Sequence, residues 1–133
     1  METLQQFVLV GIGGALGSIA RWQLSGFILH RAFDWKFPLG TFVVNALGCL
    51  VIGMLAGLAV KEDYFSGDMR LFLFTGIMGG FTTFSSFGLE TFYLLKRGEY
   101  LIAGGNIVLS VVLGMLALFW GFQAIVDKTQ SLA

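Results

Sequence analysis

The sequence predicts an all-α membrane protein with four transmembrane helices, and two observations lead to that prediction. Of the 133 residues, 56% are hydrophobic and only 12% are charged. Soluble domains carry about 25% charged residues, so this chain has too little polar surface to fold in water. The charges also gather in short clusters, and the apolar runs between them reach the roughly 20 residues that a spanning helix needs. Open β-sheets are excluded from lipid because their edges would leave backbone groups without partners.

Four apolar runs are separated by three short charged segments. The runs cover roughly residues 4–30, 39–60, 69–95 and 101–126 and form one domain that includes the whole chain. The first run follows a nearly neutral segment without the basic start or cleavage site of a signal peptide, so we expect a helix of the mature protein. An even number of spans places both termini on the same side of the membrane.

The basic residues of the connections are almost evenly divided between the two sides of the membrane. Three lie on the side of the termini and four on the other: Lys61, Arg70 and Lys128, and Arg31, Lys36, Lys96 and Arg97. An excess of basic residues normally sets the orientation of a membrane protein. A chain without that excess can insert both ways, which favours an antiparallel, dual-topology homodimer. The alternative is a single orientation set by the lipid or the translocon.

Small residues in the first run predict close helix packing. Gly13 and Gly17 are four residues apart, a common spacing at helix contacts in membranes. Arg21 follows one turn later on the same side. Two interpretations of this arginine are open. In one, it lies at the mouth of an aqueous cavity and raises the local anion concentration. In the other, it snorkels to the membrane interface.

Two pairs of polar residues lie at helical spacing inside the second and fourth runs. Thr41 and Asn45 are one turn apart in the second run, and Asn106 and Ser110 are one turn apart in the fourth. Polar side chains inside a span are functional candidates, because their burial without partners is unfavourable. Alternatively, they hydrogen-bond to neighbouring helices, and the spacing alone leaves both interpretations open.

The third run contains poor helix formers at the depth of the bilayer centre. Three glycines, at positions 76, 79 and 80, are followed by four hydroxyl residues between Thr82 and Ser86. These residues make a poor continuous helix, so we predict a break near Gly79–Thr83. Carbonyl groups freed at the end of the first half-helix are suitable cation ligands, and the second half-helix begins with free N–H donors.

An aromatic pair follows the predicted break. Phe84 and Phe87 are three residues apart and share one helix face, which Glu90 continues. The edge of an aromatic ring is electropositive, so ring edges turned toward a lumen would suit a partly dehydrated anion. The alternative for the pair is ordinary packing. Glu90 either accepts hydrogen bonds from hydroxyl groups along a pathway or snorkels from the helix end.

One stretch of the third run closely resembles the signature of the Fluc (CrcB) family of fluoride channels: Gly79-Gly80-Phe81-Thr82-Thr83-Phe84-Ser85-Ser86-Phe87. Two further segments are similar to that family: Gly13-Gly14-x-x-Gly17-x-x-x-Arg21 and Gly40-Thr41-x-x-Val44-Asn45-x-x-Gly48. The likeness covers all four runs in order.

The resemblance implies an antiparallel dual-topology dimer with two fluoride pores, each built from both subunits. It places the ring edges of Phe84 and Phe87 toward the ion and makes Asn45 a hydrogen-bond donor to fluoride. It also implies a structural sodium ion at the dimer interface, held by the backbone carbonyls of Gly79 and Thr82 from each subunit.

The same resemblance implies a vestibule and a polar track beyond the phenylalanines. It places Arg21 near the vestibule. The residues that it places along the track are Thr41, Ser110 and Glu90. The likeness is weaker at Asn106 and Gly114, where we would expect further hydroxyl side chains.

We therefore predict a fluoride-selective channel in the bacterial inner membrane, a multi-pass protein that lets fluoride leave the cytoplasm passively. Its expected partners are a second copy of itself, fluoride and lipid. A net charge of zero gives no basic surface for nucleic acid. The sequence has a single histidine, His30, and no nucleophile with a paired base, so we do not expect an enzyme.

Two alternative functions remain. A proton-coupled exporter of the small multidrug resistance type would need a carboxylate deep in its first span, where this chain has only Arg21. A non-transporting subunit of a membrane assembly would use the same glycines and polar residues for packing.

Overall fold

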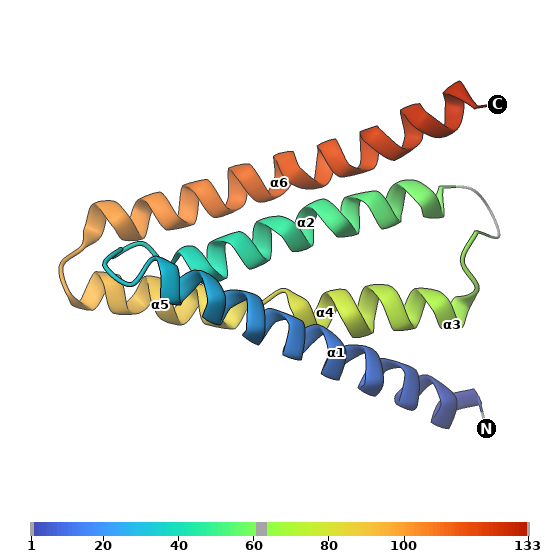
Figure 1. Ribbon diagram of the computed structural model, residues 1–133, viewed down its shortest axis with the longest axis horizontal. Coiled ribbons are helices and arrows are strands. Elements are labelled where there is room, and N and C mark those ends of the chain that lie inside the picture. The colour runs from blue at the N-terminus through green and yellow to red at the C-terminus, as the bar shows by residue number, and fades with distance from the viewer. Residues whose placement is uncertain (1, 61–63, 133) are drawn as a thin grey trace.

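The computed structural model describes residues 2–60 and 64–132, and these residues form only helices and their connections. The first two helices are α1 (Glu2–Arg31) and α2 (Leu39–Ala59), and the last is α6 (Tyr100–Ser131). The third span is divided into α3 (Gly67–Arg70), η1 (Leu71–Met78), α4 (Gly79–Phe81) and α5 (Phe84–Lys96). Both termini lie at one end of the bundle, and the α1–α2 and α5–α6 connections lie at the other (Figure 1).

Among the described residues, four helical stretches are long and apolar enough to cross a membrane: Thr3–Arg31, Leu39–Ala59, Gly67–Lys96 and Tyr100–Ser131. The prediction of an all-α membrane protein with four spans is therefore confirmed. Helix α6 continues beyond residue 126 because polar residues extend it, and Gln123 Nε2 donates to Asp127 Oδ1 one turn later at 3.1 Å. The charges at this end mark where the apolar run stops, not where the helix ends.

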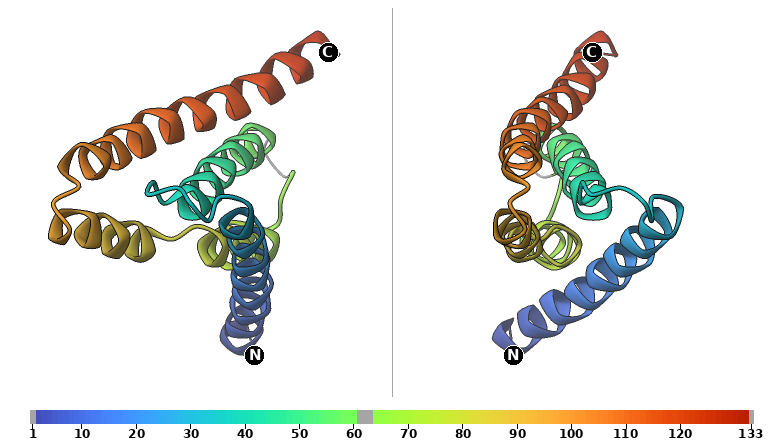
Figure 2. Two further views of the ribbon diagram at one scale, coloured as in Figure 1. Left: turned by 60° about the vertical axis from the view of Figure 1, so that its left-hand side comes forward. Right: turned by 90° about the vertical axis from the view of Figure 1, so that its left-hand side faces the viewer.

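Glycines let two groups of helices approach closely. Helix α2 packs along α6, where a Cβ atom at Gly53 would overlap the Leu118 carbonyl and one at Gly121 would overlap the Leu50 carbonyl. Helix α1 packs against η1 and α4, and Gly17 faces the backbone of η1 in the same way. Figure 2 shows α1 and α6 on opposite sides, with α2 and the third span between them. Close packing of this kind is the usual source of helix association in lipid.

The third span changes its hydrogen-bonding pattern before it breaks. The segment η1 is a π-helix, whose N–H groups bond to carbonyls five residues earlier, as the N–H of Gly79 bonds to the Phe74 carbonyl. After the short α4, Thr82 (ψ 155°) and Thr83 (φ −149°) are extended, and α5 begins at Phe84. The third span is therefore broken, as the sequence predicts.

The break is narrower than predicted, because Gly79 and Gly80 stay helical and only Thr82 and Thr83 leave the helix. Tertiary packing explains this difference at Gly80, where a Cβ atom would overlap the carbonyl of Gly14 in α1. The glycine permits a close approach between helices, and that contact outweighs its low helix propensity.

The close packing at Gly80 can be tested by comparing alanine variants at two glycines. Gly80→Ala places a methyl group against the α1 backbone, and overpacking of this kind destabilises by about 1–3 kcal/mol. The apparent melting temperature of the purified protein in detergent should fall by several degrees. Gly11→Ala is the matched control, since a Cβ atom at Gly11 meets nothing within 4 Å. Equal melting temperatures for the two variants would contradict the packing at Gly80.

Candidate functional site

The side chain of Asn45 holds the break open. The N–H of Thr83 donates to Asn45 Oδ1 at 2.8 Å, and Asn45 Nδ2 donates to the Thr83 carbonyl at 2.9 Å. The asparagine amide on α2 thus pairs with both backbone groups of one residue, as a neighbouring β-strand would. This pairing replaces the helical hydrogen bonds that an extended residue loses inside a membrane span.

Two threonine side chains satisfy the helix ends on either side of the break. Thr82 Oγ1 donates to the Met78 carbonyl at 2.9 Å, which closes the end of α4. Thr83 is the N-cap of α5, because its Oγ1 accepts from the N–H of Ser86 at 3.2 Å. An N-cap hydroxyl satisfies one of the N–H groups that a helix start leaves free. The Thr-Phe-Ser-Ser order after the glycines was the sequence signal for this cap, although we predicted no specific role for Thr83.

These bonds release two carbonyl groups at the break. The helical donor for the Gly79 carbonyl would be the N–H of Thr83, which donates instead to Asn45. The donor for the Thr82 carbonyl would be the N–H of Ser86, which donates to Thr83 Oγ1. Freed carbonyls at the end of a half-helix are suitable ligands for a monovalent cation. Acidic, histidine and cysteine side chains do not form such a site, because the described residues contain no cluster of three or more of them.

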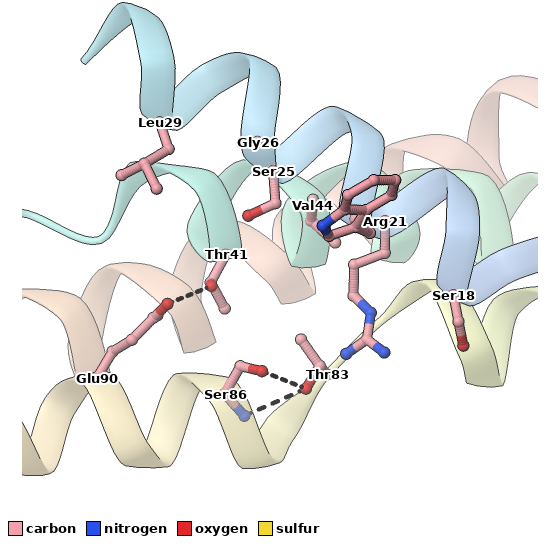
Figure 3. A pocket seen from close by; sticks show the side chains of 11 residues that line it. Ser18, Arg21, Ser25, Gly26, Leu29, Thr41, Val44, Thr83, Ser86 and Glu90 are labelled. Carbon is pink, nitrogen blue, oxygen red and sulfur yellow. Dashed lines mark hydrogen bonds between the residues drawn. The ribbon is translucent and has the colours of Figure 1, made fainter. Parts of the chain in front are cut away.

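A cavity of about 380 Å³ with both polar and apolar lining residues lies between α1, α2 and α5. We call it the arginine cavity, and its polar lining includes Ser18, Arg21, Ser25, Thr41, Ser86 and Glu90. Thr41 Oγ1 donates to Glu90 Oε1 at 2.7 Å, whereas Glu90 Oε2 is buried without a partner among the described residues. The guanidinium group of Arg21 extends toward Thr83 at the start of α5 (Figure 3). Arg21 forms no ion pair with any described residue, so its charge remains available to an anion.

A second cavity, of about 320 Å³, lies on the other side of the break. We call it the phenylalanine cavity, and its lining includes Asn45, Thr82, Thr83, Phe84, Phe87 and Ser110. The ring centroids of Phe84 and Phe87 are 5.4 Å apart, with the ring planes tilted by 43°. The Phe84 side chain is 84% exposed in the single chain, so the cavity is open on this side.

The predicted site residues thus divide into two groups that meet at Thr83, which lines both cavities. Arg21, Thr41 and Glu90 lie in the arginine cavity. Asn45, Phe84, Phe87 and Ser110 lie in the phenylalanine cavity. The polar track that we placed through Thr41, Glu90 and Ser110 is therefore divided by the wall at the break.

Two residues of α6, Asn106 and Gly114, lie where the likeness to the family is weaker, and both are buried. Asn106 is buried, with 1% of its surface exposed, and its Nδ2 donates to Thr91 Oγ1 on α5 at 2.9 Å. It therefore joins two helices and does not line either cavity. Gly114 is buried and faces Cys49 Sγ on α2. Thr91 was missed in the sequence, although its place one turn after Phe87 on the face toward α6 could have indicated it.

Comparison with known proteins identifies the family. A family model described as CrcB-like protein, Camphor Resistance (CrcB), matches residues 8–122. The chain belongs to the CrcB family. This assignment confirms the resemblance that the three sequence segments suggested, and it supports a multi-pass membrane protein that is not an enzyme.

Several curated relatives of this CrcB-family chain are named fluoride-specific ion channel FluC. One from Methylobacillus flagellatus is 57% identical over 122 residues, which cover 92% of this chain and 95% of the relative. Others come from Azobacteroides pseudotrichonymphae, 43% identical over 90% of this chain and 94% of the relative, and Nitratidesulfovibrio vulgaris, 44% identical over 89% and 98%. The residues matched by the family model include the break and the lining of both cavities.

The pairing of Asn45 with Thr83 predicts local protection from hydrogen exchange. Asn45→Ala removes two hydrogen bonds of about 1 kcal/mol each, so the Thr83 amide should exchange roughly thirtyfold faster. Exchange mass spectrometry of the segment 82–86 in detergent measures this. Thr41→Val is the matched control, because it removes a hydrogen bond one turn earlier on α2 that does not involve Thr83. If the segment exchanges equally in wild type and Asn45→Ala, the amide pairing does not hold the break.

Proposed function

We propose that this chain is a fluoride channel that lets fluoride leave the cell passively. Hydrogen fluoride crosses membranes as a neutral acid and dissociates at cytosolic pH, and a selective pore would release the trapped anion. Membership of the CrcB family and the names of its relatives support this function. The structural observation that carries the proposal is the phenylalanine cavity, which combines two aromatic rings with uncharged hydrogen-bond donors.

The chemistry of this cavity suits a small dehydrated anion. Ring edges of Phe84 and Phe87 offer weak electropositive contact without holding water as a charged group would. Asn45 uses one Nδ2 hydrogen for the Thr83 carbonyl, so its second is free for an anion. The Ser110 hydroxyl donates to Asn106 in this chain and would become a further donor by turning toward an anion. A narrow lumen with few donors would favour fluoride over the larger chloride.

The arginine cavity provides the approach to that pathway. The charge of Arg21, which pairs with no described residue, would raise the local concentration of anions in this cavity. Thr41 on α2 and Glu90 on α5, hydrogen-bonded to each other, also line this cavity. We propose that Arg21 lies in a vestibule and that the polar route includes Thr41 and Glu90 on one side of the break and Ser110 on the other, as the family resemblance suggests.

We further propose that two copies associate in antiparallel orientation. The nearly equal division of basic residues supports insertion in both orientations. The exposed surfaces of Gly79 and Phe84 support a partner at the break, because lipid cannot bond to the freed carbonyls there. A functional species with the mass of one 14.5 kDa chain would exclude this arrangement.

Sodium is the cation that we propose for the freed carbonyls. Gly79 and Thr82 of both copies would supply hard oxygen ligands, and the ion would join the two breaks. Its positive charge would also favour anions in the neighbouring pathways. The role is structural.

The function is tested by ion efflux from liposomes that contain only this protein. Fluoride should leave at least about a hundredfold faster than chloride, a ratio that corresponds to roughly 2.7 kcal/mol of discrimination. Ion-selective electrodes measure both. Equal release of the two halides, or none, would reject the channel and favour a non-transporting membrane subunit. Release of a cationic dye driven by a proton gradient would favour an exporter.

The phenylalanine variants test the pathway. Phe84→Ile and Phe87→Ile keep an apolar side chain of similar bulk but remove the polarised ring edge, so fluoride efflux should fall at least about tenfold. Phe119→Ile is the matched control, because Phe119 is an exposed aromatic residue of α6 outside both cavities. Wild-type efflux from both variants would show that the rings do not contact the ion.

The cation site is tested by replacing sodium during purification. Protein prepared with N-methyl-D-glucamine should melt at a lower temperature than protein in sodium, because an ion that binds only the folded state stabilises it. Chloride is kept constant in both samples. Returning sodium should restore the melting temperature, and a melting temperature that is independent of sodium would count against the site.

A further inference from the structure

A chain of three hydrogen bonds connects the phenylalanine cavity to the interior of the protein. Ser110 Oγ, on the cavity wall, bonds to Asn106 Oδ1 at 3.3 Å. Asn106 Nδ2 bonds to Thr91 Oγ1 at 2.9 Å, and Thr91 Oγ1 bonds to the Phe87 carbonyl at 2.8 Å. The chain begins at a serine on α6 and returns, through α5, to the backbone of a phenylalanine in the same cavity.

The carbonyl of Phe87 fixes the direction of every hydrogen in this chain. A carbonyl only accepts, so Thr91 donates its single hydrogen to Phe87. Thr91 must then accept from Asn106, which requires the NH₂ end of the amide to face it. The amide oxygen of Asn106 therefore faces Ser110, and Ser110 must donate. The network determines the orientation of the Asn106 amide without ambiguity.

The direction of these hydrogen bonds determines which part of the Ser110 hydroxyl faces the phenylalanine cavity. The only hydroxyl hydrogen of Ser110 is committed to Asn106, so the lone pairs of Ser110 face the cavity when it holds no anion. An anion needs a donor, so the Ser110 hydroxyl must turn away from Asn106 to bind one. The bond that it would leave is the longest of the three, at 3.3 Å, and a long hydrogen bond is easily exchanged.

Asn106 cannot contact the ion itself. Only 1% of its surface is exposed, and it is absent from the lining of both cavities. Any effect of Asn106 on the pathway must therefore pass through Ser110 or through the packing of α5 against α6. The two routes differ in their dependence on Ser110, so they can be separated by experiment.

We propose that Asn106 is a positioning residue of the anion pathway, which holds the Ser110 hydroxyl by a weak hydrogen bond that an arriving anion replaces. This inference rests on the proposed fluoride channel. A serine in a helix can donate to the backbone carbonyl one turn earlier. Without the Asn106 side chain, the Ser110 hydroxyl would form that bond. That bond would commit the hydroxyl hydrogen to the helix and weaken its donation to the anion.

The experiment measures the fluoride concentration that gives half-maximal efflux, together with the melting temperature. Asn106→Leu should raise the half-maximal concentration about fivefold, the change expected for one hydrogen bond to the ion. Ser110→Ala should raise it by a similar factor in the wild-type background. In the Asn106→Leu background, Ser110→Ala should add less than about twofold, because the two residues act as a unit.

Thr91→Val is the matched control. It removes the same α5–α6 hydrogen bond as Asn106→Leu but leaves Asn106 Oδ1 in place for Ser110. Both variants should lower the melting temperature, and only Asn106→Leu should change the half-maximal concentration. Equal effects of the two variants, or full additivity with Ser110→Ala, would overturn the proposal and leave Asn106 as a packing residue.

Two further outcomes are distinguished by the same set of proteins. If Asn106→Leu does not fold, Asn106→Ala in the same double-variant comparison with Ser110→Ala decides between dependence and additivity. If the wild-type protein conducts no fluoride, the channel itself is rejected. If wild-type efflux is normal and Asn106→Leu has the wild-type half-maximal concentration, only the role of Asn106 is rejected.

Discussion

The two hydrogen bonds between Asn45 and Thr83 are the interaction on which the rest of the site depends. Without them, the extended N–H and carbonyl of Thr83 would have no partner inside the membrane span, and nothing on α2 would fix the start of α5. The placement of Phe84 and Phe87 and the freeing of the two carbonyls both follow from that start. A single amide on α2 therefore determines where α5 begins and which groups it presents. The apolar interior of the membrane makes this pairing necessary, since lipid offers no hydrogen bonds to replace it.

Thr83 connects that pairing to both cavities. Its backbone bonds to Asn45, its hydroxyl caps α5, and the same residue forms the wall between the two cavities. One cavity holds an arginine and a glutamate, whereas the other offers aromatic rings and neutral donors. In the proposed channel, an anion attracted by the arginine would next meet the neutral phenylalanine cavity, where dehydration matters more than net charge. The order of these environments follows from the position of the break.

The sequence predicted the parts of this arrangement that depend on local composition. Clusters of charge located the four spans, and the glycine–hydroxyl run located the break to within a few residues. The helical state of Gly80 was not predictable, because it depends on contact with Gly14 in a distant helix. The division of the polar residues also required the structure, since Ser110 and Thr41 gain their positions from α6 and α2. Spacing along one helix says which residues share a face, but not which partner that face meets.

The backbone at the break favours a second copy more than the exposed aromatic ring does. A phenylalanine on the surface of a membrane protein, such as Phe84, can face lipid without an energetic penalty. The freed carbonyls of Gly79 and Thr82 cannot, because each polar group left unbonded in hydrocarbon is unfavourable by several kcal/mol. The Asn45 pairing that opens the break therefore leaves two carbonyl groups that the described residues of one chain do not satisfy. An antiparallel copy would bring the same two carbonyls to the same depth, and a shared cation would satisfy all four.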